Sequence, residues 1–216
     1  ATGILGPTDF IEFYGEVNDG SLDKQLYKTD LLQMSSKNSL YTDTAAYFLT
    51  VNTSTANKRM VAAVNDVAGN VLTAEPYFIY TLGKYYRNQM NVGYGYDLGE
   101  LVSAASYETA EGWSSANIGP GGKLADNNAS LRLYTSGPTA TLTTVMAGNA
   151  YTSRTATTKI RGNTIATTPI NGYNISRVTS TSIPLTYFVN DSARLEFSSA
   201  SSSTGDKMIV SYFELT

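Results

Sequence analysis

Apolar and polar residues alternate with a period of two along several stretches of this chain. Between Ala193 and Phe197, apolar residues occupy every second position, and Arg194 and Glu196 lie between them. Successive side chains of a β-strand point to opposite faces of its sheet, so this pattern predicts a strand with one buried face. Related patterns predict further strands at residues 10–14, 47–51, 60–64, 77–82, 130–134, 139–145, 157–165, 173–179, 187–189 and 207–213.

The composition favours the same kind of structure. Ser and Thr make up 50 of the 216 residues, and the chain has 16 Tyr and 18 Gly. Thr and Tyr favour strands, whereas Gly and Ser favour turns. Many short strands separated by turns are typical of a sandwich or barrel. The sequence therefore predicts an all-β fold, an antiparallel β-sandwich of jelly-roll type, with at most one or two short helices near residues 23–34 and 98–107.

Two segments near the carboxyl end have distinct expected roles. Residues 207–213 are apolar on both faces, which indicates a central strand. The preceding loop, residues 198–206, is rich in Ser and predicts an exposed, mobile tip between the last two strands.

The expected domain organisation is simple. We expect residues 1–14 to form an extended arm or edge strand and residues 15–216 to form the sandwich. Pro120, Gly121 and Gly122 interrupt the pattern, so a boundary inside the sandwich is possible near residues 115–123.

Cysteine and histidine are both absent. Their absence excludes disulfides, thiolate nucleophiles, Ser-His-Asp triads and ordinary zinc sites. Paired carboxylates remain as a general catalytic option, for example Asp9 with Glu12 or Glu108 with Glu111, but their spacing does not single out either pair. We therefore expect no enzymatic activity, no cofactor and no metal.

The charge of the chain limits its partners. The net charge is −3 and only 15% of the residues are charged, whereas nucleic-acid binding needs clustered Lys and Arg. No run of about 18 apolar residues occurs, so we expect no membrane span. Low charge also removes the repulsion that keeps monomers apart, which favours contacts between copies of the chain.

Aromatic residues gather in the middle of the sequence. Tyrosine offers a large contact area with a polar tip and is enriched at interfaces. Three interpretations stay open for this group: core packing, a subunit interface, or a platform on which a sugar ring stacks. The candidate residues are Tyr77, Tyr80, Tyr85, Tyr86, Tyr94, Tyr96 and Trp113.

The first fourteen residues form a candidate arm for strand exchange. This segment contains Pro7 and several large apolar residues: Ile4, Leu5, Phe10, Ile11 and Phe13. Such a segment either forms a strand of its own sheet or adds as a strand to the sheet of a neighbouring subunit.

The last third of the chain resembles jelly-roll structural proteins of virions, such as capsid, turret, spike or decoration proteins. The resemblance lies in residues 181–213, where an apolar strand, a turn, an alternating strand, a long tip and a second apolar strand follow one another. It implies a two-sheet sandwich that associates with copies of itself. Capsid proteins of this type often have a basic arm, but residues 1–14 contain no base, which favours an outer position on the particle.

The sequence thus predicts a non-enzymatic structural component of an exposed assembly. The leading interpretation is a virion coat, spike or decoration protein at the virion surface, with copies of itself and other coat or surface proteins as partners. The alternatives are a secreted or cell-surface filament or adhesin subunit that uses donor-strand exchange, and a carbohydrate-binding module with a glycan as partner.

Overall fold

The computed structural model describes residues 6–8, 10–50, 60–64, 68–69, 73–129 and 131–216. Among these residues the regular elements are strands and short 3-10 helices. The strands are β1 (Leu82–Tyr85), β2 (Gln89–Asn91), β3 (Gly93–Asp97), β4 (Glu100–Ala104), β5 (Gly112–Ser114), β6 (Lys123–Asn128), β7 (Ala140–Gly148), β8 (Ser153–Ile160), β9 (Asn163–Asn171), β10 (Ile175–Ile183), β11 (Ala193–Ala200) and β12 (Met208–Leu215). The 3-10 helices are η1 (Leu22–Leu26), η2 (Asp30–Leu32) and η3 (Leu185–Tyr187). Nothing helical in this described part has the length and apolarity that a membrane crossing needs.

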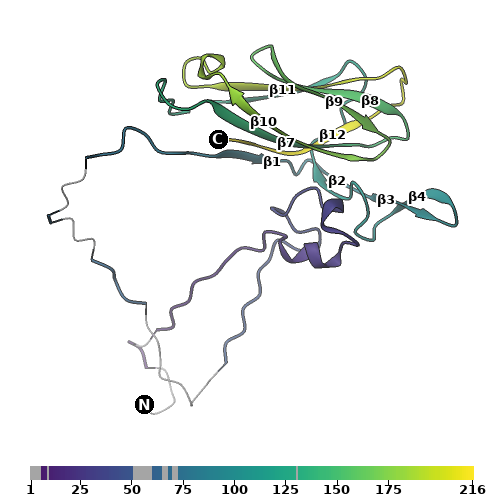
Figure 1. Cartoon of the computed structure of the whole chain (residues 1–216). Coiled ribbons are helices and arrows are strands. Elements are labelled where there is room, and N and C mark those ends of the chain that lie inside the picture. Colours follow the sequence, from purple (N-terminus) through teal and green to yellow (C-terminus); the bar gives the residue numbers. More distant parts are fainter. Residues whose placement is uncertain (1–5, 9, 51–59, 65–67, 70–72, 130) are drawn as a thin grey trace.

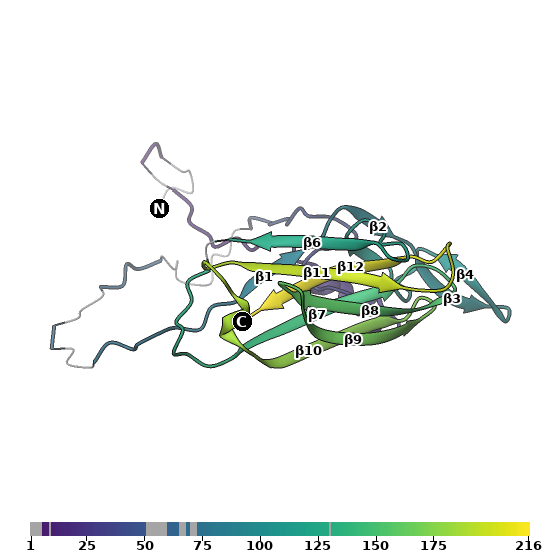
Figure 2. The same cartoon turned by 90° about the horizontal axis from the view of Figure 1, so that it is seen from above.

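Two four-stranded antiparallel sheets form a sandwich. One has the order β1-β12-β7-β10 and the other β6-β11-β8-β9, and they face each other across the main core (Figures 1 and 2). Ala193, Leu195 and Phe197 of β11 are 0% exposed and point into this core, as their alternation predicts. The all-β, jelly-roll-like sandwich is therefore confirmed.

Strand β12 is buried on both faces, as the sequence of residues 207–213 predicts. It pairs with β1 on one side and β7 on the other. Met208 and Val210 belong to the main core, whereas Ile209 packs with Met34 and Tyr173 in a second apolar cluster. Both faces of the sheet are thus covered.

The second cluster exists because a layer of loops and short strands covers the outer face of the sheet that contains β12. Residues 18–43, with η1 and η2, lie beneath this sheet in Figure 1, next to β2. Arg177 of β10 donates from Nη2 to the carbonyl oxygens of Leu31 (3.0 Å) and Gln33 (2.6 Å). These bonds attach the layer to the sandwich.

Both predicted helices are absent from the described structure. Around residues 98–107 the chain forms the β3–β4 hairpin, because Leu98 (φ 49°) and Gly99 (φ 84°) both adopt the positive φ that a tight hairpin turn needs. Residues 23–34 contain only η1 and η2. Similarly, the single strand predicted at residues 157–165 is the β8–β9 hairpin, which turns at Arg161 and Gly162.

The loop between β11 and β12 is shorter than predicted. Strand β11 continues to Ala200, and Ser199 is buried. Near the other end of the loop, Asp206 is also buried, where it pairs with Arg154 of β8.

The segment around Pro120 is bonded to both sheets. The amide of Ser115 donates to the carbonyl of Val210 in β12, and the amide of Gly121 donates to the carbonyl of Ser199 in β11. A tight turn, closed by a hydrogen bond from Gly122 to Gly119, then leads directly into β6.

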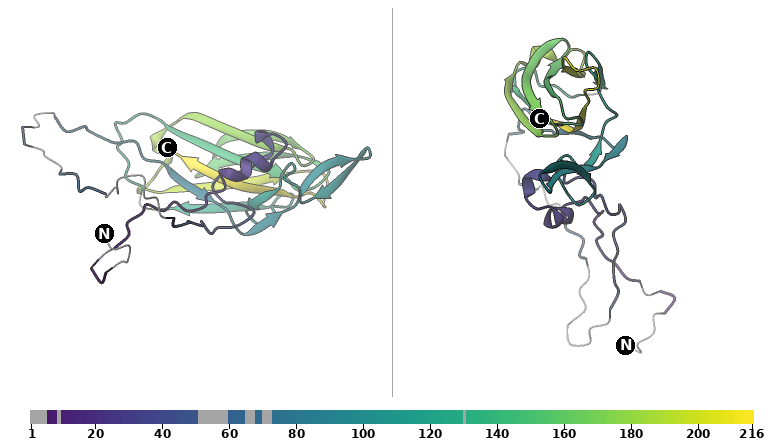
Figure 3. Two further views of the ribbon diagram at one scale, coloured as in Figure 1. Left: turned by 90° about the horizontal axis from the view of Figure 1, so that it is seen from below. Right: turned by 90° about the vertical axis from the view of Figure 1, so that its right-hand side faces the viewer.

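The sandwich begins only at Leu82. Of the preceding residues, 18–43 pack on its outer face, whereas residues 10–17 and 43–50 extend away from it (Figures 1 and 3). Several segments with a strand pattern have no strand partner in the described structure: 10–14, 47–50, 60–64, 77–81 and 131–134. Residues 187–189 likewise form no strand, because Tyr187 ends η3. Ile4, Leu5 and residues 51 and 130 lie outside the described residues.

Candidate functional site

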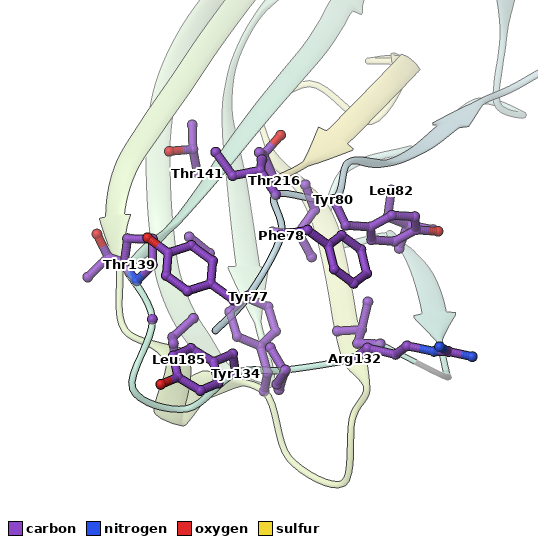
Figure 4. Close-up of a pocket in the computed structure, with 18 of the residues that line it drawn as sticks. Tyr77, Phe78, Tyr80, Leu82, Arg132, Tyr134, Thr139, Thr141, Leu185 and Thr216 are labelled. Atoms are coloured by element: carbon purple, nitrogen blue, oxygen red, sulfur yellow. The ribbon is translucent and has the colours of Figure 1, made fainter. Parts of the chain in front are cut away.

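An apolar groove lies at the end of the sandwich where β7 begins and β12 ends. Its volume is about 910 Å³. The walls come from residues 75–82, residues 131–141 and the segment after β10, and Figure 4 shows their side chains converging. Leu131, Phe188 and Leu215 line the groove and also belong to the main core. The groove is therefore an opening through which the core meets solvent.

Aromatic side chains form one wall of the groove. Tyr77 stacks on Tyr134, with ring centroids 5.4 Å apart and an interplanar angle of 17°. The two residues are 42% and 43% exposed, so each ring keeps a free surface. Phe78 and Tyr80 beside them are still more exposed. The wall thus offers an unusually large accessible aromatic surface.

The backbone on two sides of the groove has open hydrogen-bonding edges. In the described structure, the backbone of Phe78, Ile79 and Tyr80 has no hydrogen-bond partner, and neither has that of Arg132 and Leu133. Unpaired extended backbone is a template for another strand. Both segments also have the sequence pattern of strands, so they resemble strands without a neighbour.

A second exposed, extended region is formed by residues 10–17 and 43–50, which we call the two-segment arm. The two segments lie together and extend away from the sandwich (Figure 3). The rings of Phe13 and Tyr47 are 5.6 Å apart, and the Tyr47 hydroxyl donates to the carbonyl of Glu16. At the base of the arm, Asn18 Nδ2 donates to the carbonyl of Thr42 at 2.8 Å. No strand ladder joins the two segments.

The arm presents large apolar side chains to solvent. Those that are exposed are Phe10, Ile11, Phe13, Tyr14, Val17, Tyr47, Phe48 and Leu49. Within the described chain, most of the exposed large apolar side chains precede Leu82. Exposed apolar surface on this scale marks an interaction site.

The structure distributes the predicted aromatic group over four places. Only Tyr77 and Tyr80 line the groove. Tyr86 is buried in the main core, and its hydroxyl donates to Asp126 at 3.1 Å. Tyr85, the last residue of β1, packs against Tyr212.

The remaining members lie in the layer outside the sandwich. Tyr94 stacks on Tyr173 with ring centroids 3.4 Å apart, and Tyr96 is exposed on the β3–β4 hairpin. Trp113 Nε1 donates to the carbonyl of Ser39, and Arg87 lies over its ring. These contacts fit packing better than a shared ligand platform.

Sequence reasoning missed the floor of the groove. Leu131, Leu185, Phe188 and Leu215 come from distant parts of the chain, so their convergence has no sequence signature. The sequence offered one indication of the groove. Residues 130–134 have the pattern of a strand, and their described part lines the groove without forming a strand.

The carboxylates of Glu108 and Glu111 form contacts within the folded chain. Both residues are buried, and Oε2 of Glu111 accepts the amide hydrogen of Glu108 at 3.0 Å. Lys28 forms an ion pair with Glu108. Burial raises the pKa of Glu111. Across the described residues, no three acidic side chains gather as a metal ion would need.

Comparisons with known proteins find weak structural similarities. The sequence matches no protein-family model and no curated protein. Among solved structures, the chain is similar to dimeric latent PorU from Porphyromonas gingivalis, with 12% identity, a TM-score of 0.44, and coverage of 62% of this chain but 12% of PorU. It is also similar to carbohydrate-binding module CBM36 in complex with calcium and xylotriose, with 14% identity, a TM-score of 0.38, and coverage of 64% of this chain and 100% of the module.

A third similar structure is the EclA C-terminal domain, described as a sugar-binding protein, with 14% identity, a TM-score of 0.34, and coverage of 69% of this chain and 86% of that domain. All three TM-scores lie below 0.5, so the function proposed below rests on the geometry of this chain. None of the three structures is a virion protein, so they give no support to the virion resemblance.

Proposed function

We propose that the chain is a non-enzymatic subunit of a surface or secreted polymer, held together by extended segments that pass between copies. The observation that carries this proposal is the set of segments with strand patterns and exposed apolar side chains but no strand partner within one copy. This is the filament or adhesin alternative of the sequence analysis.

The energetics of the arm support association. Ordering an extended segment costs about 1–2 kcal/mol of backbone entropy per residue. Full burial of a Phe or Leu side chain returns roughly 1.5–3 kcal/mol. In one copy the arm has neither a hydrogen-bond ladder nor buried apolar side chains. A second copy can supply both, which makes an assembled form favourable.

The surface chemistry fits close contacts between copies. With 15% charged residues and a net charge of −3, the chain has little self-repulsion. Its many Ser, Thr and Asn residues form hydrogen bonds without a charge to desolvate. Such contacts depend only weakly on salt.

We propose a filament rather than a virion coat because the arm and the groove are separate features on one copy. Contacts between two different surfaces are heterologous, and such contacts can propagate along an open chain. A location on a cell surface or outside the cell is part of the same proposal, as is the absence of enzymatic activity.

Light scattering and negative-stain imaging test the proposal. We expect the wild-type chain to form species larger than the 23.2 kDa monomer, growing with concentration. Replacing Phe10, Ile11 and Phe13 together with Ser should return the chain to a folded monomer. The matched control replaces Tyr96 and Leu98, exposed on the β3–β4 hairpin, with Ser and should assemble normally. Equal assembly of both variants would contradict the role of the arm.

Glycan binding in the groove is a second candidate function. The stacked, partly exposed rings of Tyr77 and Tyr134 could pack against the apolar face of a sugar, with Arg132 and Asp191 as hydrogen-bonding groups at the rim. A glycan array probed with the monomeric arm variant tests it. Binding lost on Tyr134→Ala would support a glycan site, and no binding to any glycan would remove this candidate.

A further inference from the structure

We propose that the outer face of the sheet β6-β11-β8-β9 is a binding surface for an acidic polysaccharide. We call this surface the basic face, and it consists of the outward side chains of the four strands and of the β8–β9 turn. The inference goes beyond the proposed function, because it assigns a ligand to a part of the molecule that includes neither the groove nor the arm.

The basic face is open to solvent. The layer of residues 18–43 lies on the far side of the sandwich (Figure 1), whereas β11, β8 and β9 lie in front when the sandwich is seen from above (Figure 2). Along β11 and β8, buried residues alternate with exposed or half-buried residues that point outward. These outward residues are Arg194, Glu196, Ser198, Thr155, Thr157 and Lys159.

Positive charge dominates the basic face. Its charged residues are one acid, Glu196, and four bases, Lys123, Lys159, Arg161 and Arg194. The other acid of these strands, Asp126, is buried, and it is bound there by Lys84 and Tyr86. The chain as a whole has a net charge of −3, so this face has the opposite sign from the rest of the molecule.

The strand register brings the bases together. Lys159 lies opposite Glu196, and the amide of Arg161 donates to the carbonyl of Arg194 at 2.9 Å. The two arginines are therefore neighbours at one end of the sheet. From the spacing of strands and of residues along a strand, the Cα atoms of Arg194 and Lys159 are roughly 8 Å apart. An extended ligand could thus contact several of the bases at once.

The fold neutralises little of this charge. Lys123 forms an ion pair with Glu196 at 3.3 Å. In the described part of the chain, Lys159, Arg161 and Arg194 form no ion pair. Nη2 of Arg161 instead donates to two neutral groups, the carbonyl of Val189 at 2.9 Å and the hydroxyl of Ser192 at 2.6 Å. Like charges at opposite positions of paired strands destabilise a sheet, and an anionic ligand would offset this cost.

The other side chains of the face favour a polysaccharide among anionic partners. Of the exposed large apolar residues in the described chain, none lies on β6, β8, β9 or β11. The face therefore lacks the aromatic anchors of protein interfaces, the stacking surfaces that bind single-stranded nucleic acids, and the apolar side chains that enter membranes. Ser198, Thr157 and Thr167 instead lie opposite one another on three neighbouring strands. Such hydroxyl groups both donate and accept hydrogen bonds, as sugar hydroxyls require.

Two polysaccharides with the same backbone test the class of ligand. Dextran sulfate is anionic and dextran is neutral, so the wild-type chain should bind the first and not the second in titration calorimetry at low salt. Polygalacturonate, which carries carboxylates in place of sulfates, should also bind. The affinity for both anionic polymers should fall as the salt concentration rises, because salt screens exposed charges.

Two variants with the same net charge test the location. Lys159→Gln combined with Arg194→Gln removes two bases of the face and should weaken binding of dextran sulfate by about 10-fold. The control, Lys24→Gln combined with Lys207→Gln, removes two exposed bases elsewhere and should bind as the wild type does. Urea denaturation should find both variants about as stable as the wild type, since surface substitutions usually change stability little.

Several results would overturn the assignment. These are no binding of either anionic polymer, an equal loss of binding in the two variants, and tighter binding of a DNA duplex than of polygalacturonate at the same salt concentration. Loss of polymer growth in the Lys159→Gln, Arg194→Gln variant would also overturn it, because the face would then be a contact between copies. A wild-type chain that stays monomeric defeats the proposed function but not this assignment, since each copy has the complete basic face.

Discussion

Arg154 and Asp206 form an ion pair in which both side chains are 0% exposed. Nη2 of Arg154 lies 2.7 Å from Oδ1 of Asp206, and Nε donates to the same oxygen at 2.9 Å. Nη1 donates to the carbonyl of Gly172 at 2.6 Å, and Nη2 donates to the carbonyls of Ala150 and Thr152. The pair joins β8 of one sheet to the loop before β12 of the other.

This ion pair between Arg154 and Asp206, which we call the clamp, lies at the end of the sandwich opposite the groove. Strand β7 shows the relation, because Ala140 at its start lines the groove and Gly148 at its end lies beside Arg154. The sandwich is thus closed at one end and open at the other.

Removing one partner of the clamp should strongly destabilise the fold. Asp206→Asn leaves the Arg154 charge buried without its counterion, which typically costs about 3–5 kcal/mol. Urea denaturation measures the free energy of unfolding. Asp97→Asn, an exposed carboxylate at the end of β3, is the matched control and should change stability by less than about 0.5 kcal/mol. Equal losses in the two variants would contradict the importance of the clamp.

The same pair predicts a dependence of stability on pH. Although burial alone would raise the pKa of Asp206, hydrogen bonds from Arg154 and Thr152 and the Arg154 charge hold it below its ordinary value. A carboxylate with a lowered pKa in the folded state stabilises the fold above its unfolded pKa, about 3.9. That contribution is lost as pH falls through the lower, folded pKa. Urea midpoints from pH 6 to pH 2 should therefore fall more steeply for the wild type than for Asp206→Asn, and parallel curves would contradict this.

Gly148 should tolerate no side chain. A Cβ at this position would lie 1.6 Å from Nη1 of Arg154 and 1.7 Å from the carbonyl oxygen of Gly172. Gly148→Ala should displace the clamp and cost at least about 3 kcal/mol, at the upper end for overpacking. Gly119, where a Cβ would meet nothing within 4 Å, is the control, and Gly119→Ala should be nearly neutral. Thermal unfolding compares the two.

Two phenylalanines should separate folding from assembly. Phe197 is fully buried in the main core, so Phe197→Ala should cost about 3–5 kcal/mol of unfolding free energy. Phe13 is exposed in the arm, so Phe13→Ala should leave the unfolding midpoint of the monomer unchanged but weaken assembly. Denaturation and light scattering on both variants provide the check. A large loss of monomer stability in Phe13→Ala would show that the arm belongs to the fold of its own copy.

Strands of the sandwich could be predicted from the sequence where one buried face makes apolar and polar residues alternate. Strands β7, β10, β11 and β12 were expected near their observed positions, and in β11 the alternating Ala193, Leu195 and Phe197 are the buried residues. Strands β2 and β3 were not, because their buried positions, Asn91 and Gly93, carry no large apolar side chain. Asn91 illustrates the difference, since its Nδ2 is held by the Ser114 hydroxyl at 2.6 Å rather than by apolar burial.

The sequence proposes Phe10, Ile11 and Phe13 as contact residues because a run of large apolar residues indicates a strand, and this stays a prediction. The groove was not predicted, because its floor joins Leu131, Phe188 and Leu215, which only tertiary folding brings together. The clamp was missed for a related reason, since a Ser-rich loop gives no sign that Asp206 is buried.

The mass of the wild-type chain as a function of concentration tests the central claim most directly. Light scattering should give a mass above 23.2 kDa that increases with concentration, and replacing Phe10, Ile11 and Phe13 together with Ser should abolish this increase. A constant mass of 23.2 kDa over the whole range would contradict the claim that exposed extended segments of one copy contact another copy.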